Sequence, residues 1–329
     1  VAYAKARNIE IIPEVDLPGH MVAAVASYPE LSCDPSKKYE VRIDGGISKD
    51  VLNVGDDRVI DFLKCVLGHV ATVFPYDYVH IGGDECPTDQ WKTNQMCLDR
   101  VKELGIDGVH QLQSWLVEEL GIFLKEEYGK DIIVWDELLA NWNDNNKTKP
   151  VIMAWNGMGF STQAANRGFK SIIVPYQYLY IDFMQGEEGD LFVDEPYHGG
   201  WGVNTVDEIY GLNPLSALSG KEEFALGVQC NMWTETCNDI DEVEYCLLPR
   251  MLAVSEIGWL PTDKKDWTSF YLRLQTHDEI FDHLDYQYAK HFIEPKDYTG
   301  QESTIMEAEE ILAKSIRGGV GYPSAEVYD

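Results

Sequence analysis

Two adjacent carboxylates, Asp84 and Glu85, follow an apolar run through two glycines, Gly82 and Gly83. A carboxylate pair at the end of a buried strand is costly, because desolvation and mutual repulsion raise the pKa of at least one of the two acids. An acid that keeps its proton beside one that stays ionised is what a general acid with an electrostatic helper requires. The structural alternative is that Asp84 caps the next helix and Glu85 lies in its first turn. The local sequence leaves both interpretations open.

Aromatic and acidic residues also follow other apolar runs of the chain. Trp135, Trp155 and Trp233 each come directly after such a run. Tyr180 with Asp182, and Trp233 with Glu235, are spaced two residues apart, so that the members of each pair point the same way on an extended chain. A sugar ring stacks its C–H face on indole, and its hydroxyls need charged acceptors. Core packing is the commoner explanation for a single tryptophan, but three at successive strand ends favour a sugar-binding site.

Two histidines lie near the same predicted strand ends. His20 follows a Pro–Gly turn, where an imidazole could orient an acid or contact a substrate, whereas we expect His80 to be a hydrogen-bonded structural residue. A metal site would recruit both histidines together with Asp84 and Glu85. Because the chain has no H-x-H or H-E-x-x-H spacing, we expect no metal there.

The elements that position these residues are short runs rich in Ile and Val, usually followed by amphipathic helices. This order predicts parallel strands that are buried on both faces and covered by outer helices. We expect six clear strands and a weaker seventh, at 9–15, 76–82, 131–134, 150–154, 171–175, 225–232 and, for the weaker one, 51–54. Residues 1–8 read as the end of a helix, so we expect a first strand upstream of Val1. The predicted fold class is therefore α/β, a (β/α)8 TIM-type barrel whose first strand is missing from this chain.

Helices are predicted at 57–74, from 109 to a stop at Gly129, at 241–255 and at 266–284. The segment between Glu137 and Pro150 is too short and turn-rich for a full helix, so we expect a loop to replace one outer helix there. A long loop with aromatic residues is expected at 186–218. We expect two parts, a catalytic barrel at 1–294 that is truncated at its N-terminus and a tail at 295–329 with one amphipathic helix.

Composition limits the classes of partner. The chain carries 26 basic and 56 acidic residues, a formal net charge of −30, and no local basic patch is visible, so a nucleic acid or an anionic membrane surface would be repelled. No apolar run approaches the ~20 residues that span a bilayer. The seven cysteines lack the spacing of a zinc site. We expect no nucleic-acid partner, no membrane span and no structural metal.

Six motifs in this order resemble family 20 of the glycoside hydrolases, the β-N-acetylhexosaminidases, over residues 9 to about 284. They are PEVDLPGH at 13–20, HIGGDE at 80–85, WDE at 135–137, AWNG at 154–157, YID at 180–182 and WTE at 233–235. The resemblance implies a retaining exo-hydrolase that needs no cofactor and acts on glycans with a terminal β-linked N-acetylhexosamine. The sugar's own 2-acetamido oxygen attacks the anomeric carbon, an exception to the two-carboxylate scheme. Family members are commonly exported or lysosomal, which implies an extracytoplasmic location.

The resemblance also implies a role for each candidate residue. Glu85 would protonate the leaving oxygen and later activate water, and Asp84 would hold the acetamido N–H. Tyr180 would donate its hydroxyl to the acetamido oxygen. The remaining residues would bind the sugar: Trp135, Trp155 and Trp233 would enclose the acetyl methyl and the ring, Asp182 and Glu235 would accept hydrogen bonds from hydroxyls, and His20 would tune the surroundings of the acid.

The chain departs from the family pattern at its start. Family members carry an arginine on the first strand that clamps the terminal sugar, and usually a separate α/β domain ahead of the barrel. Neither is present here, so we expect this chain to be a fragment. A non-catalytic carbohydrate-binding barrel is the main alternative function, and the intact Asp84–Glu85 pair argues against it. A metal-dependent hydrolase on the same fold is a second alternative.

Overall fold

The computed structural model describes residues 1–186 and 202–290, and these form two compact units. The first unit contains residues 1–153 and 167–170, and the second contains residues 154–166 and the described residues from 171 onward. The predicted tail at 295–329 lies outside the described residues, so the predicted boundary after residue 294 stays a prediction.

The first unit contains three parallel strands that follow one another in space as they do in the chain. Tyr78 of the first strand pairs with Asp131 of the second, and Ile133 of the second pairs with Val151 of the third. The elements are α1 Ala2–Lys5, α2 Val22–Ser27, η1 Pro29–Leu31, α3 Asp57–Val73, β1 Tyr78–His80, α4 Gln95–Leu104, η2 Val109–Gln111, α5 Leu112–Tyr128, β2 Asp131–Trp135, η3 Asp136–Ala140 and β3 Val151–Ala154.

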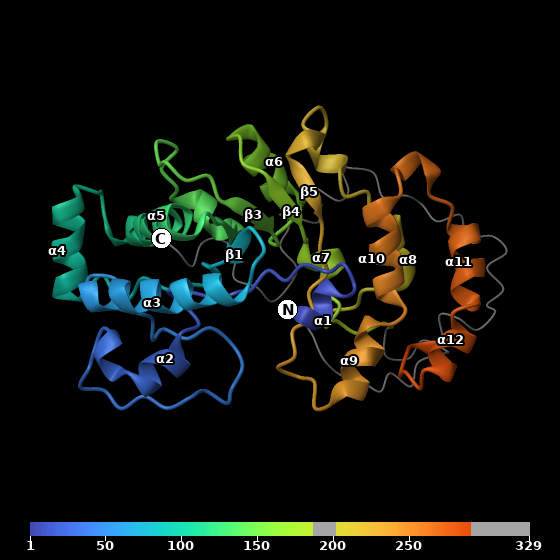
Figure 1. Cartoon of the computed structure of the whole chain (residues 1–329), viewed down its shortest axis with the longest axis horizontal. Coiled ribbons are helices and arrows are strands. Elements are labelled where there is room, and N and C mark those ends of the chain that lie inside the picture. The colour runs from blue at the N-terminus through green and yellow to red at the C-terminus, as the bar shows by residue number, and fades with distance from the viewer. Residues whose placement is uncertain (187–201, 291–329) are drawn as a thin grey trace. The chain divides into compact units, whose positions relative to one another are not determined.

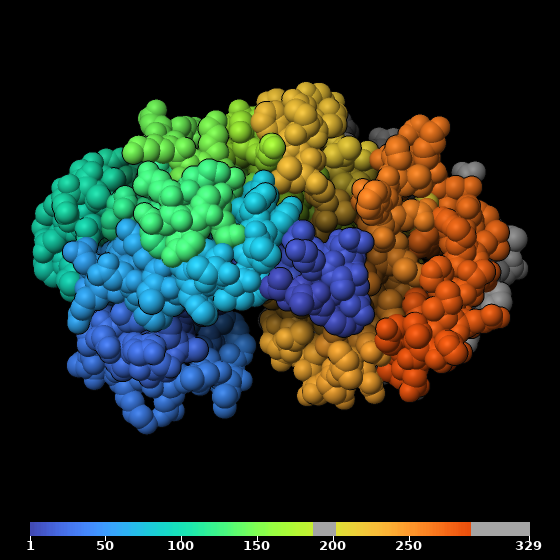
Figure 2. Space-filling view, viewed as in Figure 1, coloured from blue at the N-terminus to red at the C-terminus, as the bar shows by residue number. Residues whose placement is uncertain are grey.

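Local sequence explains the two long helices of this unit. The Asp56 carboxylate accepts a hydrogen bond from the backbone N–H of Arg58 at 2.9 Å and so caps the start of α3. Helix α5 ends at Gly129, whose φ of 70° is a left-handed conformation that favours glycine. Helices α3 and α5 lie side by side (Figure 1), whereas the short α1 lies at the surface (dark blue in Figure 2).

The second unit contains two parallel strands, with Ser171 opposite Ala225. Helix α10 packs against α8 and against β5. The elements are α6 Met158–Asn166, β4 Ser171–Ile173, α7 Tyr176–Leu179, α8 Val206–Gly211, η4 Ser216–Leu218, η5 Glu222–Phe224, β5 Ala225–Val228, α9 Ile240–Leu247, α10 Arg250–Trp259, η6 Thr262–Lys264, α11 Trp267–Gln275 and α12 Asp278–His283. None of the helices in the described part of the chain is long and apolar enough to cross a membrane.

Five predicted strands are confirmed, because β1, β3, β4 and β5 lie within predicted runs and β2 extends only one residue past the run at 131–134. The predicted loop between β2 and β3 is also confirmed, since only the short η3 occurs there. The predicted strand at 9–15 is wrong: Glu14 alone forms a parallel bridge with His80, and Pro13 has no N–H to extend the ladder. The weaker strand at 51–54 is wrong as well, because only Leu52 forms a bridge there, with Ser32.

Two predicted helices are interrupted. The helix at 241–255 is divided into α9 and α10 at Pro249, and the helix at 266–284 is divided into α11 and α12. The predicted loop at 186–218 is wrong in its later part, because helix α8 occurs there at Val206–Gly211. Thr205 and Glu208 form a capping box, in which each side chain accepts a hydrogen bond from the other residue's backbone N–H. Residues 187–201 of that loop lie outside the described residues.

A buried arginine holds the second unit together. Arg250 is 0% exposed, and its guanidinium donates hydrogen bonds to the backbone carbonyls of Ile181, Phe183, Asn204 and Cys246 at 2.5 to 3.0 Å. These carbonyls belong to three segments of the chain. A guanidinium offers five N–H donors in a fixed plane, which a lysine ammonium cannot reproduce.

We therefore expect Arg250→Lys to lower the free energy of unfolding by about 3 kcal/mol, because buried carbonyls lose a charged donor. Urea unfolding followed by circular dichroism measures this change. The matched control is Arg273→Lys, which alters a half-exposed arginine paired with Glu256 at 2.7 Å, and we expect a change below about 1 kcal/mol there. Equal effects of the two substitutions would contradict the structural role of Arg250.

Candidate active site

The glycines after β1 allow the backbone to pass close to Asp16. Gly82 has a φ of 68°, and a Cβ added to it would lie 1.7 Å from Asp16 Oδ1. The next amide, Gly83 N–H, donates a hydrogen bond to the same oxygen at 3.0 Å. The helix-cap interpretation of Asp84 is wrong, because the next helix, α4, begins only at Gln95.

His20 lies between the two predicted catalytic carboxylates. Its Nε2 is 3.6 Å from Asp84 Oδ2 and 3.4 Å from Glu85 Oε2. His20 and Glu85 have φ values of 51° and 45°, a left-handed conformation that is unfavourable for residues other than glycine. Such backbone strain is found mainly where the surrounding structure fixes a functional residue. The structure thus brings together three of the predicted site residues.

Burial and charge perturb the ionisation of this cluster. Burial raises the pKa of Asp84, and the pKa of Asp16 is raised by burial and by the adjacent charge of Asp84. The pKa of His20 is raised to about 9, first by its hydrogen bond with Glu85 and then by the two aspartates. His20 is therefore an imidazolium at neutral pH, and the hydrogen bond between Asp16 and Asp84 leaves the proton of that pair on Asp16.

One oxygen of Asp84 lacks a partner. Asp84 Oδ1 is buried, and no hydrogen bond to it occurs within residues 1–186 and 202–290. A buried carboxylate oxygen without a donor is costly, so this position suits a ligand group that brings an N–H or O–H. Asp16, His20 and Asp84 also place donor atoms within 4.8 Å of one another, a spacing at which they could hold a metal ion.

Trp135 lies at the end of β2, in the same unit as the acids. Its indole N–H donates a hydrogen bond to Glu14 Oε1 at 2.9 Å, and its ring centre is 4.9 Å from that of His80. His80 is buried and hydrogen-bonded through its ring, which agrees with the structural role expected for it.

The other predicted aromatic residues form a cluster in the second unit. The ring of Tyr180 stacks on Trp155 at 5.9 Å with 14° between their planes, and it contacts Trp233 at 6.0 Å and 63°. Tyr180 forms a parallel bridge with Asn231, so the extended chain after β4 and β5 positions it. Trp155 and Tyr180 are nearly fully buried.

Asp182 follows Tyr180 at the same strand end. Burial raises its pKa to about 7, and the negative charge of Glu235 adds to this effect. Its Oδ1 and the Asn231 side-chain nitrogen are buried without a hydrogen-bond partner in the described part of the chain. The second unit thus also presents buried polar atoms beside aromatic rings, an arrangement that suits a sugar hydroxyl.

Sequence reasoning missed three residues of these clusters, namely Glu14, Asp16 and Asn231. A signal for the first two was present, because they are spaced two residues apart, like Tyr180 and Asp182. Asn231 gave no signal, because its position depends on the pairing of two strand ends.

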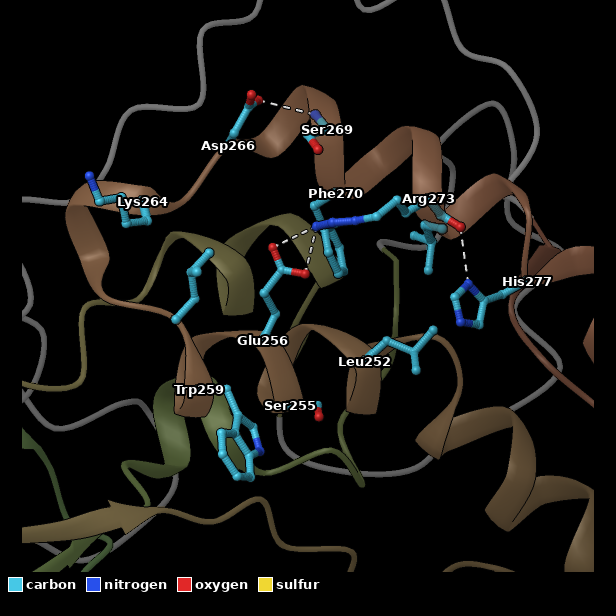
Figure 3. Close-up of a pocket in the computed structure, with 12 residues that line it drawn as sticks. Leu252, Ser255, Glu256, Trp259, Lys264, Asp266, Ser269, Phe270, Arg273 and His277 are labelled. Atoms are coloured by element: carbon cyan, nitrogen blue, oxygen red, sulfur yellow. Dashed lines mark hydrogen bonds and ion pairs between the residues drawn. The ribbon is translucent and has the colours of Figure 1, made fainter.

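A separate hollow lies between helices α10 and α11 (Figure 3). It measures about 540 Å³, and none of the predicted site residues lines it. Glu256 and Arg273 form an ion pair across it, and His277 Nδ1 lies 3.0 Å from the Arg273 carbonyl oxygen. The charged groups at its centre thus already have partners, and the strand ends remain the better candidate for chemistry.

Comparison with known proteins identifies relatives. A family model described as "Glycosyl hydrolase family 20, catalytic domain" matches residues 1–262. The chain is 38% identical over 277 residues to a beta-hexosaminidase of Porphyromonas gingivalis, which covers 83% of this chain and 34% of that protein. It is 32% identical over 261 residues to a beta-hexosaminidase of Vibrio furnissii, covering 78% of this chain and 42% of that protein.

A solved structure is similar as well. It is a GH20 exo beta-N-acetylglucosaminidase from Vibrio harveyi in complex with N-acetylglucosamine, with a TM-score of 0.76, 29% identity, and coverage of 88% of this chain and 45% of that one. The chain therefore spans a third to a half of the length of these relatives. Catalytic domains of this family are TIM barrels, so the predicted α/β barrel fold class is confirmed.

The His20 environment gives a testable pH dependence. We expect the His20 imidazole to titrate near pH 9. The substitution Glu85→Gln should bring the pKa of His20 back toward the ordinary 6.5, because the hydrogen bond with Glu85 is the largest cause of the shift. A raised pKa stabilises the folded state fully below pH 6.5, and this contribution is lost as the pH rises through 9. NMR of the histidine-labelled protein, with His20→Asn to assign the signal, measures both values. Titration near 6.5 in the unsubstituted protein would rule out this charge arrangement.

Proposed function

Because the chain belongs to family 20 of the glycoside hydrolases, we propose that it removes terminal β-linked N-acetylhexosamine from glycans with retention of anomeric configuration. Exo action and the 2-acetamido requirement follow from the resemblance of the motifs. The extracytoplasmic location expected for the family is also a proposal, and fractionation of the source cells tests it.

The buried, unpartnered Asp84 Oδ1 carries this proposal. An acetamido N–H is a donor that this oxygen can accept, and accepting it fixes the amide next to the anomeric carbon. The negative charge of Asp84 also offsets the positive charge that develops on the amide as its oxygen attacks. Burial raises the pKa of Asp84, whereas the charge of His20 and the hydrogen bond with Asp16 favour the ionised form of Asp84.

The first step needs a proton donor and an internal nucleophile. Glu85 protonates the glycosidic oxygen while the acetamido oxygen attacks the anomeric carbon, so that the glycosidic bond breaks and a cyclic oxazolinium forms. No carboxylate of the protein has to reach the anomeric carbon, which accounts for two adjacent acids where a retaining pair would be ~5 Å apart on opposite sides of the bond. Positioning replaces a nucleophile of the protein.

The second step returns the proton. Glu85, now ionised, takes a proton from water as the water oxygen attacks the anomeric carbon, and the oxazolinium ring opens to the acetamido group. The product keeps the β configuration because the carbon is attacked twice from opposite faces. His20 Nε2 is 3.4 Å from Glu85 Oε2, so it can orient this carboxyl group through both steps.

The aromatic cluster of the second unit supplies apolar and hydrogen-bonding surface for a sugar. The family resemblance implies that Trp155 and Trp233 contact the acetyl methyl and the ring, and that the Tyr180 hydroxyl donates to the acetamido oxygen. The buried Asp182 Oδ1, which lacks a partner among the described residues, suits a sugar hydroxyl. Aromatic rings with carboxylates at their edges support a carbohydrate as the substrate class.

A metal-dependent hydrolase is the second candidate, because Asp16, His20 and Asp84 could hold a cation. In that case a cation would displace the proton on Asp16 and one proton of His20, because an imidazolium has no lone pair that could hold a metal. Incubation with EDTA distinguishes the two functions, since the proposed mechanism needs no metal and should keep its full rate.

We expect Glu85→Gln to lower kcat for 4-nitrophenyl N-acetyl-β-D-glucosaminide by roughly 10²- to 10⁴-fold, because the amide can neither donate nor accept the transferred proton. Steady-state kinetics of the full protein measures this loss. The matched control is Glu126→Gln, which alters an exposed residue of α5 and should leave kcat unchanged. Binding of the sugar without turnover in the unsubstituted protein would favour a non-catalytic carbohydrate-binding barrel.

Asp84→Asn tests the role of the 2-acetamido group. We expect a loss of about 10²- to 10³-fold in kcat on the N-acetyl substrate, because the neutral amide no longer offsets the charge on the oxazolinium. The control is Asp77→Asn, which alters an exposed residue beside the opposite end of β1 and should leave kcat unchanged. Equal turnover of a plain 4-nitrophenyl β-D-glucoside by the unsubstituted protein would exclude substrate-assisted catalysis.

A further inference from the structure

One carboxylate oxygen of Glu14 contacts two rings. The Trp135 indole N–H donates a hydrogen bond to Glu14 Oε1 at 2.9 Å, and His80 Nδ1 lies 3.1 Å from the same oxygen. The rings of His80 and Trp135 lie 4.9 Å apart. Glu14 therefore fills the position between the indole and the end of β1.

The backbone fixes Glu14 beside β1. Val15 N–H donates to the His80 carbonyl at 3.0 Å, and His80 N–H donates to the Pro13 carbonyl at 2.9 Å. These two bonds enclose the parallel bridge between Glu14 and His80. Main-chain pairing thus fixes the backbone of Glu14 beside β1.

His80 connects this contact to the catalytic turn. Its Nδ1 also lies 3.0 Å from the Gly82 amide nitrogen, two residues before Asp84. If Nδ1 carries the ring proton, it donates to the Glu14 carboxylate. If Nδ1 is unprotonated, it accepts a hydrogen bond from the Gly82 N–H. The other ring nitrogen, Nε2, is buried without a partner in the described residues. A proton on Nδ1 favours the contact with Glu14 and leaves the Gly82 N–H without this acceptor, whereas a proton on Nε2 keeps the Gly82 bond and leaves the Nε2–H unpaired.

The charge of Glu14 strengthens its hold on the indole. Burial opposes ionisation, but the hydrogen bond and charge of His80 and the indole N–H together hold the pKa of Glu14 below its ordinary value. An ionised acceptor makes a shorter and stronger hydrogen bond than a neutral one. An indole has only one N–H, so this bond fixes the rotation of the ring about its side-chain torsions.

We propose that Glu14 is a positioning residue that acts through Trp135, holding the indole in the orientation that binds the N-acetyl group of the sugar. This inference rests on the proposed function, which gives Trp135 its contact with substrate. Glu14 does not take part in proton transfer. Its removal therefore weakens binding of the sugar more than it slows the chemical step.

A double-mutant cycle tests the inference. In the unsubstituted background, Glu14→Ala should raise KM for 4-nitrophenyl N-acetyl-β-D-glucosaminide about tenfold, as expected for one charge-assisted hydrogen bond, with kcat falling less than about threefold. In a Trp135→Phe background, which lacks the indole N–H, the same substitution should change KM less than about twofold. Equal effects in both backgrounds, or a loss confined to kcat, would overturn the proposal.

Two further variants keep the test informative. Glu14→Gln retains an oxygen that accepts the indole N–H, so it should restore most of the affinity and leave KM within about threefold. The control is Glu10→Ala, at an exposed position of the same segment, which should leave KM unchanged. If Glu14→Ala fails to fold by circular dichroism, Glu14→Gln in both backgrounds decides the matter: a KM change that does not depend on Trp135 would overturn the proposal.

The two proposals fail in different ways. A lack of turnover by the unsubstituted full protein would contradict the proposed function. In that case, calorimetric titration with N-acetylglucosamine measures the affinity of each variant in the same double-mutant cycle. If Glu14→Ala changes the affinity equally with and without Trp135→Phe, the further inference is overturned. Normal turnover with an additive cycle would overturn the further inference alone.

Discussion

The cost of keeping several carboxylates in one partly buried place is the main constraint on the site of the first unit. Asp16, Asp84 and Glu85 would repel one another without compensation, and burial would add to that cost. His20 supplies a positive charge between the last two, and the Gly83 amide donates to the first. Backbone conformations that are unfavourable for ordinary residues occur at the same place, so local strain accompanies the arrangement.

The adjacency of the two acids is itself a mechanistic constraint. A retaining enzyme with its own nucleophile needs carboxylates on opposite sides of the scissile bond, which neighbours in the chain cannot provide. Neighbouring acids instead suit a reaction in which the substrate supplies the nucleophile and the protein supplies a proton and a counter-charge. The chain's membership of family 20 and the unpartnered oxygen of Asp84 support this mechanism by independent routes.

Much of this arrangement could be predicted from sequence, because parallel strands bring consecutive strand ends to one edge. The rings that follow β3, β4 and β5 are indeed close together in the second unit. What could not be predicted depends on long-range contacts. The segment at 9–15 has the composition of a strand, yet only a bridge at Glu14 forms, and the role of Asp16 depends on its distance from Gly82. The apolar periodicity at 241–255 did not indicate the break at Pro249, and the expected loop at 186–218 contains α8, which begins after the capping box at Thr205.

The close approach of Gly82 to Asp16 has a consequence for engineering. Since even a methyl group at residue 82 meets the aspartate, this position accepts hardly any residue but glycine. Randomised libraries that include residue 82 would consist mainly of inactive clones.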